Sequence, residues 1–303
     1  MARVTVQLLH SLQIAFNRAF QRGQTMARPR WHMVASRRSQ DLTYNAGNWL
    51  NKHATLREWL GERVIDELQN TYSDVISRGH EASIEVEHSD IEDNMTGLYA
   101  ALFEEMGQRA AMFPDKLVFP LLEAGFRKPC SDGRCFFDEQ HPIYENADGS
   151  GAVDYVSNMA DGSDPAWFLL APQYLLKPLT YQEKTPMSFG RMDDLSDEAV
   201  MMSGAYNYGV KGHAAAGYGL WQTAYGSRRE LSGESLSSAY RAMSLFSTDG
   251  ARPLGIRGKL LVVRPEMKAQ AREVLTSLTT ESGIPQGQIE LLVCDQFADE
   301  AGQ

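Results

Sequence analysis

An amphipathic stripe near the N-terminus limits most strongly what this chain can fold into. Between residues 5 and 22, apolar side chains recur at spacings of three and four, which places them on one face of a helix. They are Leu8, Leu12, Ala15, Phe16, Ala19 and Phe20. A single helix cannot bury such a stripe against itself, so we expect it to lie on the body of the protein or on another copy of the chain. Gly23 is expected to end the helix.

Charge separates the N-terminal segment from the rest of the chain. Nine Lys or Arg against two Asp or Glu give residues 1–60 a net charge of +7; since the whole chain carries −10, the remainder carries −17. Such an asymmetry indicates an arm that meets nucleic acid or the acidic body of a neighbouring copy, although a solvated basic face has the same composition. The residues expected to face DNA or a subunit are Arg18, Arg22, Arg28, Arg30, Arg37 and Arg38. Phe16 and Phe20 could stack on bases, but their place on the apolar stripe favours packing.

The next segment changes from a helical to a strand pattern. Ile84 and Val86 alternate with polar residues, which predicts a strand with one buried face. We interpret residues 58–88 as a long two-stranded excursion, with an exposed tip around Tyr72–Arg78.

A helix is predicted from about residue 95, interrupted by Pro114. The segment KLVFPLLEAGF then indicates a further apolar helical stretch that Gly125 closes. Acidic residues precede the first of these helices and could bind a metal, but capping and helix-dipole stabilisation explain them better. They are Asp90, Glu92 and Asp93.

Long connections and short strands fill the second half of the chain. Residues 129–165 are rich in Gly, Asp, Asn, Ser and Pro, with embedded aromatics, which is typical of a packed insertion. Strands are predicted at Trp167–Leu170, Lys259–Val263 and residues 289–294, and Pro265 is expected to open a helix. Together the patterns predict a mixed α+β fold.

Chemistry-bearing residues are sparse. Cys130 and Cys135 lie near His141, but their spacing does not match the common zinc patterns, and buried or loop thiols are the simpler interpretation. One of these thiols with His141 could form a nucleophile and base pair, which sequence proximity alone does not support. Walker A, G-x-S-x-G and H-E-x-x-H motifs are absent from the sequence. We therefore expect no enzyme activity, no cofactor and no metal.

Targeting features are also absent from the sequence as given. No apolar run approaches the roughly 20 residues needed to cross a bilayer, and the N-terminal segment lacks the pattern of a signal peptide. We expect a protein that is made in a cytoplasm and does not contact membrane.

Eight segments, in order along most of the chain, resemble the major head subunit family of Mu-like phages. They are LREWLGERVI (56–65), SDIEDNMTGLY (89–99), PDKLVFPLLEAGF (114–126), DGRCFFDEQHPIYEN (132–146), WFLL (167–170), LKPLTYQEKTP (176–186), YNYGVKGHAAAGYGLWQTAYGS (206–227) and RPLGIRGKLLVVRP (252–265). The first forty residues and the last ten match least.

The resemblance implies the Hong Kong 97 phage major-capsid fold, with an N-arm, an extension loop, a peripheral domain with a spine helix, and an axial domain. On this chain we expect the N-terminal arm at 1–45 and the extension loop and spine helix at 46–128. The mainly axial domain, with strands returning to the peripheral domain, is expected at 129–303. The predicted two-stranded excursion would be the extension loop.

Function then follows from the resemblance. It implies a capsid protein of the virion that self-assembles as pentamers and hexamers into an icosahedral head shell enclosing double-stranded DNA. Scaffold, portal and decoration proteins are the further partners, and the host cytoplasm is the place of assembly. An encapsulin-like compartment shell, or a cytoplasmic metal- or thiol-dependent enzyme, are the alternatives. Deleting residues 1–30 is expected to leave a soluble chain that cannot close shells.

Overall fold

The computed structural model describes residues 4–38, 77–93, 96–146, 149–193, 200, 204–250, 252–278, 284 and 287–297. The chain divides into two compact units. Unit 1 comprises Met1–Arg30, Ile76–Lys116 and Gln182–Ala215, and unit 2 comprises Trp31–Val75, Leu117–Tyr181 and Ala216–Gln303. No helix in these described ranges is long and apolar enough to cross a membrane.

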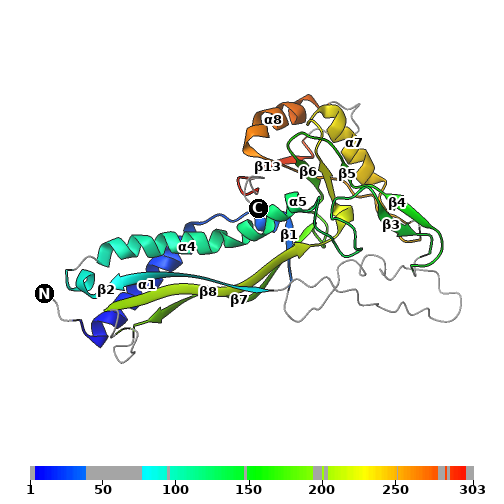
Figure 1. The fold of residues 1–303 in the computed structure, drawn as a ribbon. Coiled ribbons are helices and arrows are strands. Elements are labelled where there is room, and N and C mark those ends of the chain that lie inside the picture. Colours follow the sequence, from blue (N-terminus) through cyan, green and yellow to red (C-terminus); the bar gives the residue numbers. More distant parts are fainter. Residues whose placement is uncertain are drawn as a thin grey trace, which may run out of the picture. The chain divides into compact units, whose positions relative to one another are not determined.

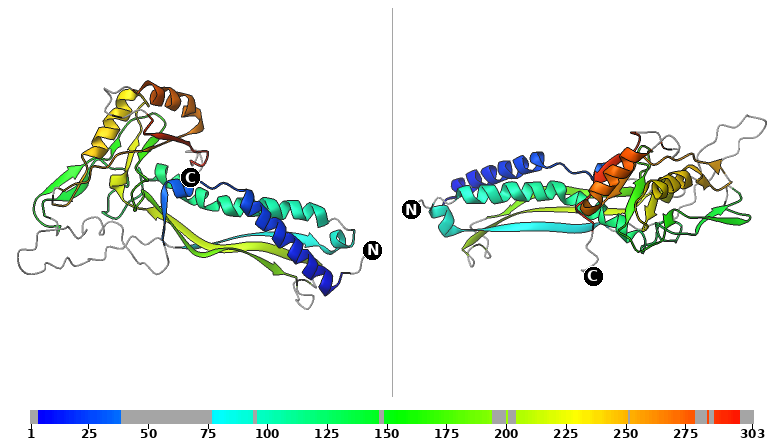
Figure 2. Two further views of the ribbon diagram at one scale, coloured as in Figure 1. Left: turned by 180° about the vertical axis from the view of Figure 1, so that it is seen from behind. Right: turned by 90° about the horizontal axis from the view of Figure 1, so that it is seen from above.

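Unit 1 is a layer of helices on a sheet (Figures 1 and 2). Its helices are α1 (Val6–Met26), α3 (His88–Glu92) and α4 (Thr96–Val118), and its strands are β2 (Arg78–Glu87), β7 (Leu179–Met192) and β8 (Ala205–Tyr218). The strands lie in the order β7-β8-β2, and α1 and α4 pack on one face of them. The mixed α+β expectation is confirmed here.

The core of unit 1 forms where the two long helices meet the sheet. Strand β2 pairs antiparallel with β8, in a register that sets Ile84 opposite Tyr208 and Val86 opposite Tyr206. Phe16 of α1 and Phe103 of α4 pack on each other and on Tyr208. The predicted strand around Ile84 and Val86 is therefore confirmed, and it begins earlier, at Arg78.

Helix α1 confirms that an amphipathic helix lies near the N-terminus, but it ends later than predicted. Thr5 caps it by accepting a hydrogen bond from the backbone N–H of Leu8 at 3.2 Å. Phe16 and Phe20 of the stripe are buried in the core, so their packing role is confirmed. The prediction that Gly23 ends the helix is wrong, because α1 continues to Met26. Gly23 instead lies against the backbone of Glu104 in α4, where a side chain would not fit.

Helix α4 confirms the helix predicted from about residue 95, but Pro114 does not interrupt it. Proline removes the one hydrogen bond to the carbonyl four residues earlier. That single loss does not end a 23-residue helix whose buried residues Phe103 and Met106 anchor it in the core. A short helix, α5 (Pro120–Ala124), follows and is capped by Gly125 as predicted.

Unit 2 is built on a five-stranded sheet with the order β13-β12-β6-β9-β5. Its strands are β5 (Met159–Ala160), β6 (Trp167–Leu170), β9 (Ala224–Ser227), β12 (Leu260–Val263) and β13 (Glu290–Val293). Every residue of β6 and β12 is buried, as expected for apolar runs covered on both faces. Helices α7 (Gly233–Ser244) and α8 (Lys268–Ser277) pack beside this sheet (Figure 1).

Shorter elements complete unit 2. They are η1 (Trp31–Met33), β1 (Ala35–Arg38), β3 (His141–Tyr144), β4 (Val153–Val156), η2 (Trp221–Thr223), β10 (Ser247–Thr248), β11 (Arg252–Pro253) and η3 (Pro265–Met267). The strands predicted around residues 167, 260 and 290 are confirmed, as is a helical segment that opens at Pro265. The segment 129–165 is mostly irregular, and its Phe136 and Phe137 are buried, which confirms a packed insertion.

Most of the two-stranded excursion predicted at residues 58–88, namely residues 58–76, lies outside the described residues. Its described end is β2, whose ladder partner is β8.

Candidate assembly surface and polar cluster

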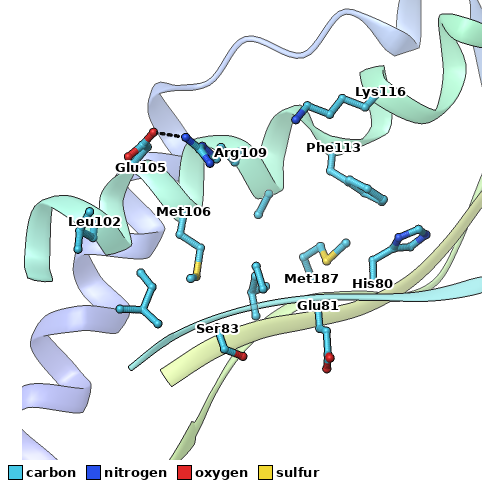
Figure 3. Close-up of a pocket in the computed structure, with 14 residues that line it drawn as sticks. His80, Glu81, Ser83, Leu102, Glu105, Met106, Arg109, Phe113, Lys116 and Met187 are labelled. Carbon is cyan, nitrogen blue, oxygen red and sulfur yellow. Dashed lines mark hydrogen bonds and ion pairs between the residues drawn. The ribbon is translucent and has the colours of Figure 1, made fainter. Parts of the chain in front are cut away.

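A groove of about 450 Å³ runs along unit 1 between α4 and β2. Helix α4 contributes Leu102, Met106 and Phe113 to it, and β2 contributes His80 and Ile84 (Figure 3). Met187 of β7 and Val210 of β8 also line it. The lining is therefore mostly apolar, and it is assembled from segments far apart in the sequence.

Charged side chains form the rim of this groove. Glu105 and Arg109 of α4 make an ion pair of 2.6 Å along the helix (Figure 3). Lys116 lies farther along the same helix, whereas the side chain of Glu81 on β2 points away from α4 (Figure 3). An apolar floor with a charged rim is the general pattern of a protein-binding surface.

Large apolar side chains are also exposed on the helices of unit 1. Leu98 of α4 is 61% exposed and Leu102 is 39% exposed. On α1, Val6 is 67%, Ile14 41% and Met26 59% exposed. Contiguous exposed apolar surface on a folded protein marks an interaction site more often than an isolated exposed leucine does. We take the groove together with Leu98 and Leu102 as the candidate assembly surface.

The six arginines singled out from the sequence fall into both units. Arg18, Arg22 and Arg28 are exposed on or just after α1, and Arg30 follows them. Arg22 pairs with Glu104 of α4 at 3.1 Å, so part of the arm's charge is balanced within unit 1.

Arg37 and Arg38 lie in β1 of unit 2. Burial lowers the pKa of Arg38. No local pattern in the sequence signals this division of the six arginines between the two units.

The acids before α4 belong to α3, with Asp90 in its first turn and Asp93 at its C-terminal end, and two of them pair locally. The Asp90 carboxylate accepts a hydrogen bond from the Tyr99 hydroxyl. Glu92 lies 3.5 Å from His88 within α3. Asp90 in the first turn of α3 fits helix-dipole stabilisation, but no side chain caps the start of α3, so the capping expectation is not confirmed there.

A second, polar cluster lies in unit 2 around Cys130, Asp132 and His141. These are the one group among the described residues in which His, Cys and carboxylate donor atoms lie within 4.8 Å of one another. The Cys130 thiol donates to Asp132 Oδ1 at 3.1 Å, and His141 Nδ1 lies 2.6 Å from Asp132 Oδ2. Cys135, which lies near both Cys130 and His141 in the sequence, does not belong to this group; the carboxylate of Asp132 does.

Electrostatics at this cluster oppose a nucleophilic thiol. Burial first, and then the neighbouring Asp132 carboxylate, raise the pKa of the Cys130 thiol far above its usual range. Burial also acts to raise the pKa of Asp132, but hydrogen bonds from His141 and Cys130 outweigh it and hold that pKa low. A reactive cysteine needs a lowered pKa, so the geometry does not support the thiol-enzyme alternative.

Comparison with known proteins gives one consistent result. The family described as Mu-like prophage major head subunit gpT matches residues 9–297. The major capsid protein of Escherichia phage Mu is 32% identical over 301 residues, covering 96% of this chain and 99% of that protein. The Mu-like prophage FluMu major head subunit of Haemophilus influenzae is 34% identical over 290 residues, covering 94% of each.

Solved structures agree with the sequence relatives. A chain of the procapsid of bacteriophage JBD30 has a TM-score of 0.81 at 36% identity, covering 96% of this chain and 99% of that chain. A chain of the capsid of the same phage has a TM-score of 0.71 at 26% identity, covering 96% and 98%. A third chain, from the JBD30 capsid decorated with minor capsid protein trimers, has a TM-score of 0.67 at 25% identity, covering 90% and 92%. The phage-capsid fold expected from the sequence is confirmed.

Proposed function

The chain belongs to the family of Mu-like prophage major head subunits, and from that premise we propose that its copies assemble, as pentamers and hexamers, into an icosahedral head shell that encloses phage DNA. The observation that carries the proposal is the likeness, over nearly the full length of both chains, to a subunit of a phage procapsid. The work of such a subunit is to make contacts with other copies of itself.

Two alternatives are weaker. An encapsulin-like compartment shell would share the fold, but the relatives found are head subunits of Mu and of a Mu-like prophage. A cytoplasmic metal- or thiol-dependent enzyme would need an activated residue. The raised pKa of the Cys130 thiol argues against it.

The candidate assembly surface is, in this proposal, a contact with a second copy of the chain. Its floor is apolar and partly exposed, and burying apolar area yields roughly 25 cal/mol per Å² before the entropy of association is subtracted. The rim carries both signs of charge, from Glu105, Arg109 and Lys116 of α4, which suits pairing with another copy of a mixed-charge chain.

The basic N-terminal segment is, in this proposal, a contact with packaged DNA. Double-stranded DNA attracts exposed Arg side chains through its phosphates without reading sequence. Arg18 and Arg28 are exposed on or just after α1, and they are the first candidates. Arg22 forms an ion pair with Glu104, so we expect it to contribute less to DNA binding. Arg30, Arg37 and Arg38 complete the expected set.

Further parts of the proposal follow from the family. The N-arm would span residues 1–45, the extension loop and spine helix 46–128, with α4 as the spine helix, and the mainly axial domain 129–303. Scaffold, portal and decoration proteins would be partners of the assembled shell, which forms in the host cytoplasm and is carried in the virion. The decorated JBD30 capsid provides the precedent for a decoration partner.

Hydroxyl-radical footprinting of free subunits and assembled particles tests the proposed contact directly. Leu102, Phe113 and Met187 are partly exposed in unit 1 and should become less reactive on assembly. Unchanged reactivity at all three in assembled particles would remove the groove from the interface. Mass spectrometry of the same particles distinguishes a phage shell from a compartment: a stoichiometric co-purified enzyme would favour the compartment.

A further inference from the structure

The imidazole of His141 is held in a fixed orientation inside unit 2. The ring is fully buried and stacks on the indole of Trp221, with 4.1 Å between ring centroids and 8° between planes. Its Nε2 lies 3.1 Å from Oδ1 of Asn158. A histidine clamped in this way presents its second nitrogen, Nδ1, in one direction only.

The neighbouring amide of Asn158 decides which ring nitrogen carries hydrogen. Its Nδ2 faces three backbone carbonyls, at 2.9, 3.4 and 3.5 Å, those of Phe136, Trp221 and Ala224. Its Oδ1 accepts the backbone N–H of Asp138 at 3.0 Å. Reversing the amide would break these hydrogen bonds, so Oδ1 must face His141. His141 Nε2 therefore carries a hydrogen and donates it to Asn158.

Three possible metal donors meet on the other side of the ring. There, Nδ1 faces Asp132 Oδ2 at 2.6 Å, so these two atoms share either a hydrogen on Nδ1 or a bound cation. The sulfur of Cys130 lies 3.1 Å from the other oxygen of the same carboxylate. Nitrogen, oxygen and sulfur donors therefore converge within 4.8 Å of one another, close enough to surround one ion.

We propose that this cluster binds a divalent cation of the zinc class through Cys130 Sγ, the Asp132 carboxylate and His141 Nδ1. Zinc accepts this mixture of sulfur, nitrogen and oxygen donors, whereas magnesium and calcium prefer oxygen alone. The Cys130 thiol releases its proton to solvent as the metal–sulfur bond forms. Asp132 is 18% exposed, which leaves a path for the ion and for water as a fourth ligand.

The surroundings match those of a metal-binding histidine. Such histidines donate their other ring N–H to a carboxylate or carbonyl group, which fixes the ring and the tautomer. Asn158 supplies that acceptor here, and its own position is fixed by backbone carbonyls that precede β3 and open β9. The bound ion would tie the turn at Cys130–Cys135 to His141 at the start of β3, within unit 2. It would serve stability and not catalysis.

The sequence spacing of Cys130, Cys135 and His141 fits no common zinc pattern, and no metal was expected on that ground. In the structure, the third possible ligand beside Cys130 and His141 is Asp132, which lies two residues after Cys130 in the turn, and not Cys135. The proposal is independent of shell assembly, so its failure would leave the proposed function intact.

Cobalt binding to the purified full-length chain tests the proposal. Co²⁺ replaces Zn²⁺ in such sites, and a thiolate ligand gives it a charge-transfer absorption in the near ultraviolet. We expect one Co²⁺ per chain with this absorption, displaced by adding Zn²⁺. The absorption should disappear in Cys130→Ser. Asp132→Asn should weaken binding by at least tenfold, and the buried thiol variant Cys294→Ser should behave as the parent chain.

A second readout guards against variants that fold poorly. Zn²⁺ alone should raise the melting temperature of the parent chain and of Cys294→Ser, because a ligand that binds only the folded state stabilises it. It should leave Cys130→Ser unchanged and raise the melting temperature of Asp132→Asn less than that of the parent chain, with circular dichroism showing both variants to be folded. A folded parent chain that binds no Co²⁺ and gains no stability from Zn²⁺ would overturn the proposal. A doubly protonated His141 paired with Asp132 would then supply the positive charge.

Discussion

Gly107 of α4 lies directly against the backbone carbonyl of Phe20 on α1. A Cβ at Gly107 would stand 2.0 Å from that oxygen. The relation is reciprocal, since a Cβ at Gly23 of α1 would stand 1.9 Å from the carbonyl oxygen of Glu104. Two glycines thus let the backbones of α1 and α4 approach more closely than any side chain permits.

Because α1 crosses α4 so closely, the N-terminal segment is part of the core of unit 1. We expected residues 1–30 to be dispensable for folding, but α1 contributes Leu12, Phe16 and Phe20 to the core of unit 1. Deleting them would expose Phe103 and Tyr208. The soluble but assembly-deficient product expected of that deletion is therefore replaced by an expectation of a poorly folded chain. Point substitutions are the better way to study assembly.

Replacing Gly107 by Ala should destabilise unit 1 by about 1–3 kcal/mol, because the methyl group forces the two helices apart. Helix propensity alone would predict the opposite sign, since Ala is favoured over Gly by about 1 kcal/mol. Gly97→Ala is the matched control, because a Cβ there meets nothing within 4 Å. Urea unfolding measures both. Equal stabilisation of the two variants would mean that the helices do not cross as described.

Asp115 should stabilise unit 1 by holding the backbone of the segment that follows α1. Its carboxylate is 1% exposed and accepts the backbone N–H of Arg30 with both oxygens, at 3.0 and 2.9 Å. Asp115→Ala leaves that N–H without its charged acceptor, which costs about 1–3 kcal/mol. We expect a matching fall in the free energy of unfolding by urea. Asp93→Asn, on an exposed carboxylate of the same unit, should change it by less than about 0.5 kcal/mol.

Leu102→Glu should leave the subunit folded but weaken its assembly. The protein concentration needed for assembly should rise by about tenfold or more. The side chain is 39% exposed on α4, so the monomer tolerates a charge there, whereas an apolar contact between copies does not. Leu245→Glu, at a leucine 73% exposed in unit 2, is the control for a surface charge as such. Light scattering against concentration measures the effect. Normal assembly of Leu102→Glu would exclude this part of α4 from the contact.

The paired reversals Arg18→Glu and Arg28→Glu should weaken the binding of DNA equally for every sequence. The slope of log affinity against log salt is negative, and each phosphate that the chain no longer neutralises should make it about 0.9 less negative. Arg272→Glu, on the exposed face of α8, is the control for a single charge reversal. Fluorescence anisotropy with duplexes of two unrelated sequences provides the measurement. An unchanged slope in the double variant would remove Arg18 and Arg28 from the DNA contact.

Local sequence patterns predicted most of the regular elements. The stripe of α1, the alternation around Ile84 and the apolar runs of β6 and β12 are short-range signals, and each element formed where it was expected. The errors arose at Gly23 and Pro114, residues that usually end helices. A close helix crossing and an anchored apolar face overrode those local preferences, and neither is visible within one segment.

The sites depend on long-range contacts and were predicted less well. The groove brings β2, α4, β7 and β8 together, and no local pattern in any of them signals a shared surface. For the cluster in unit 2, the sequence indicates Cys130 and His141 as candidate residues but does not indicate Asp132, which lies in the same turn as Cys130. Asn158 and Trp221 could not have been chosen, because only the fold brings them to His141.

The most direct test of the central claim is the size of what the purified chain forms, measured by light scattering across concentration and salt and followed by negative-stain microscopy. A major head subunit should form rings of five and six, tubes or closed shells. A chain that stays monomeric or dimeric under every condition would contradict the account.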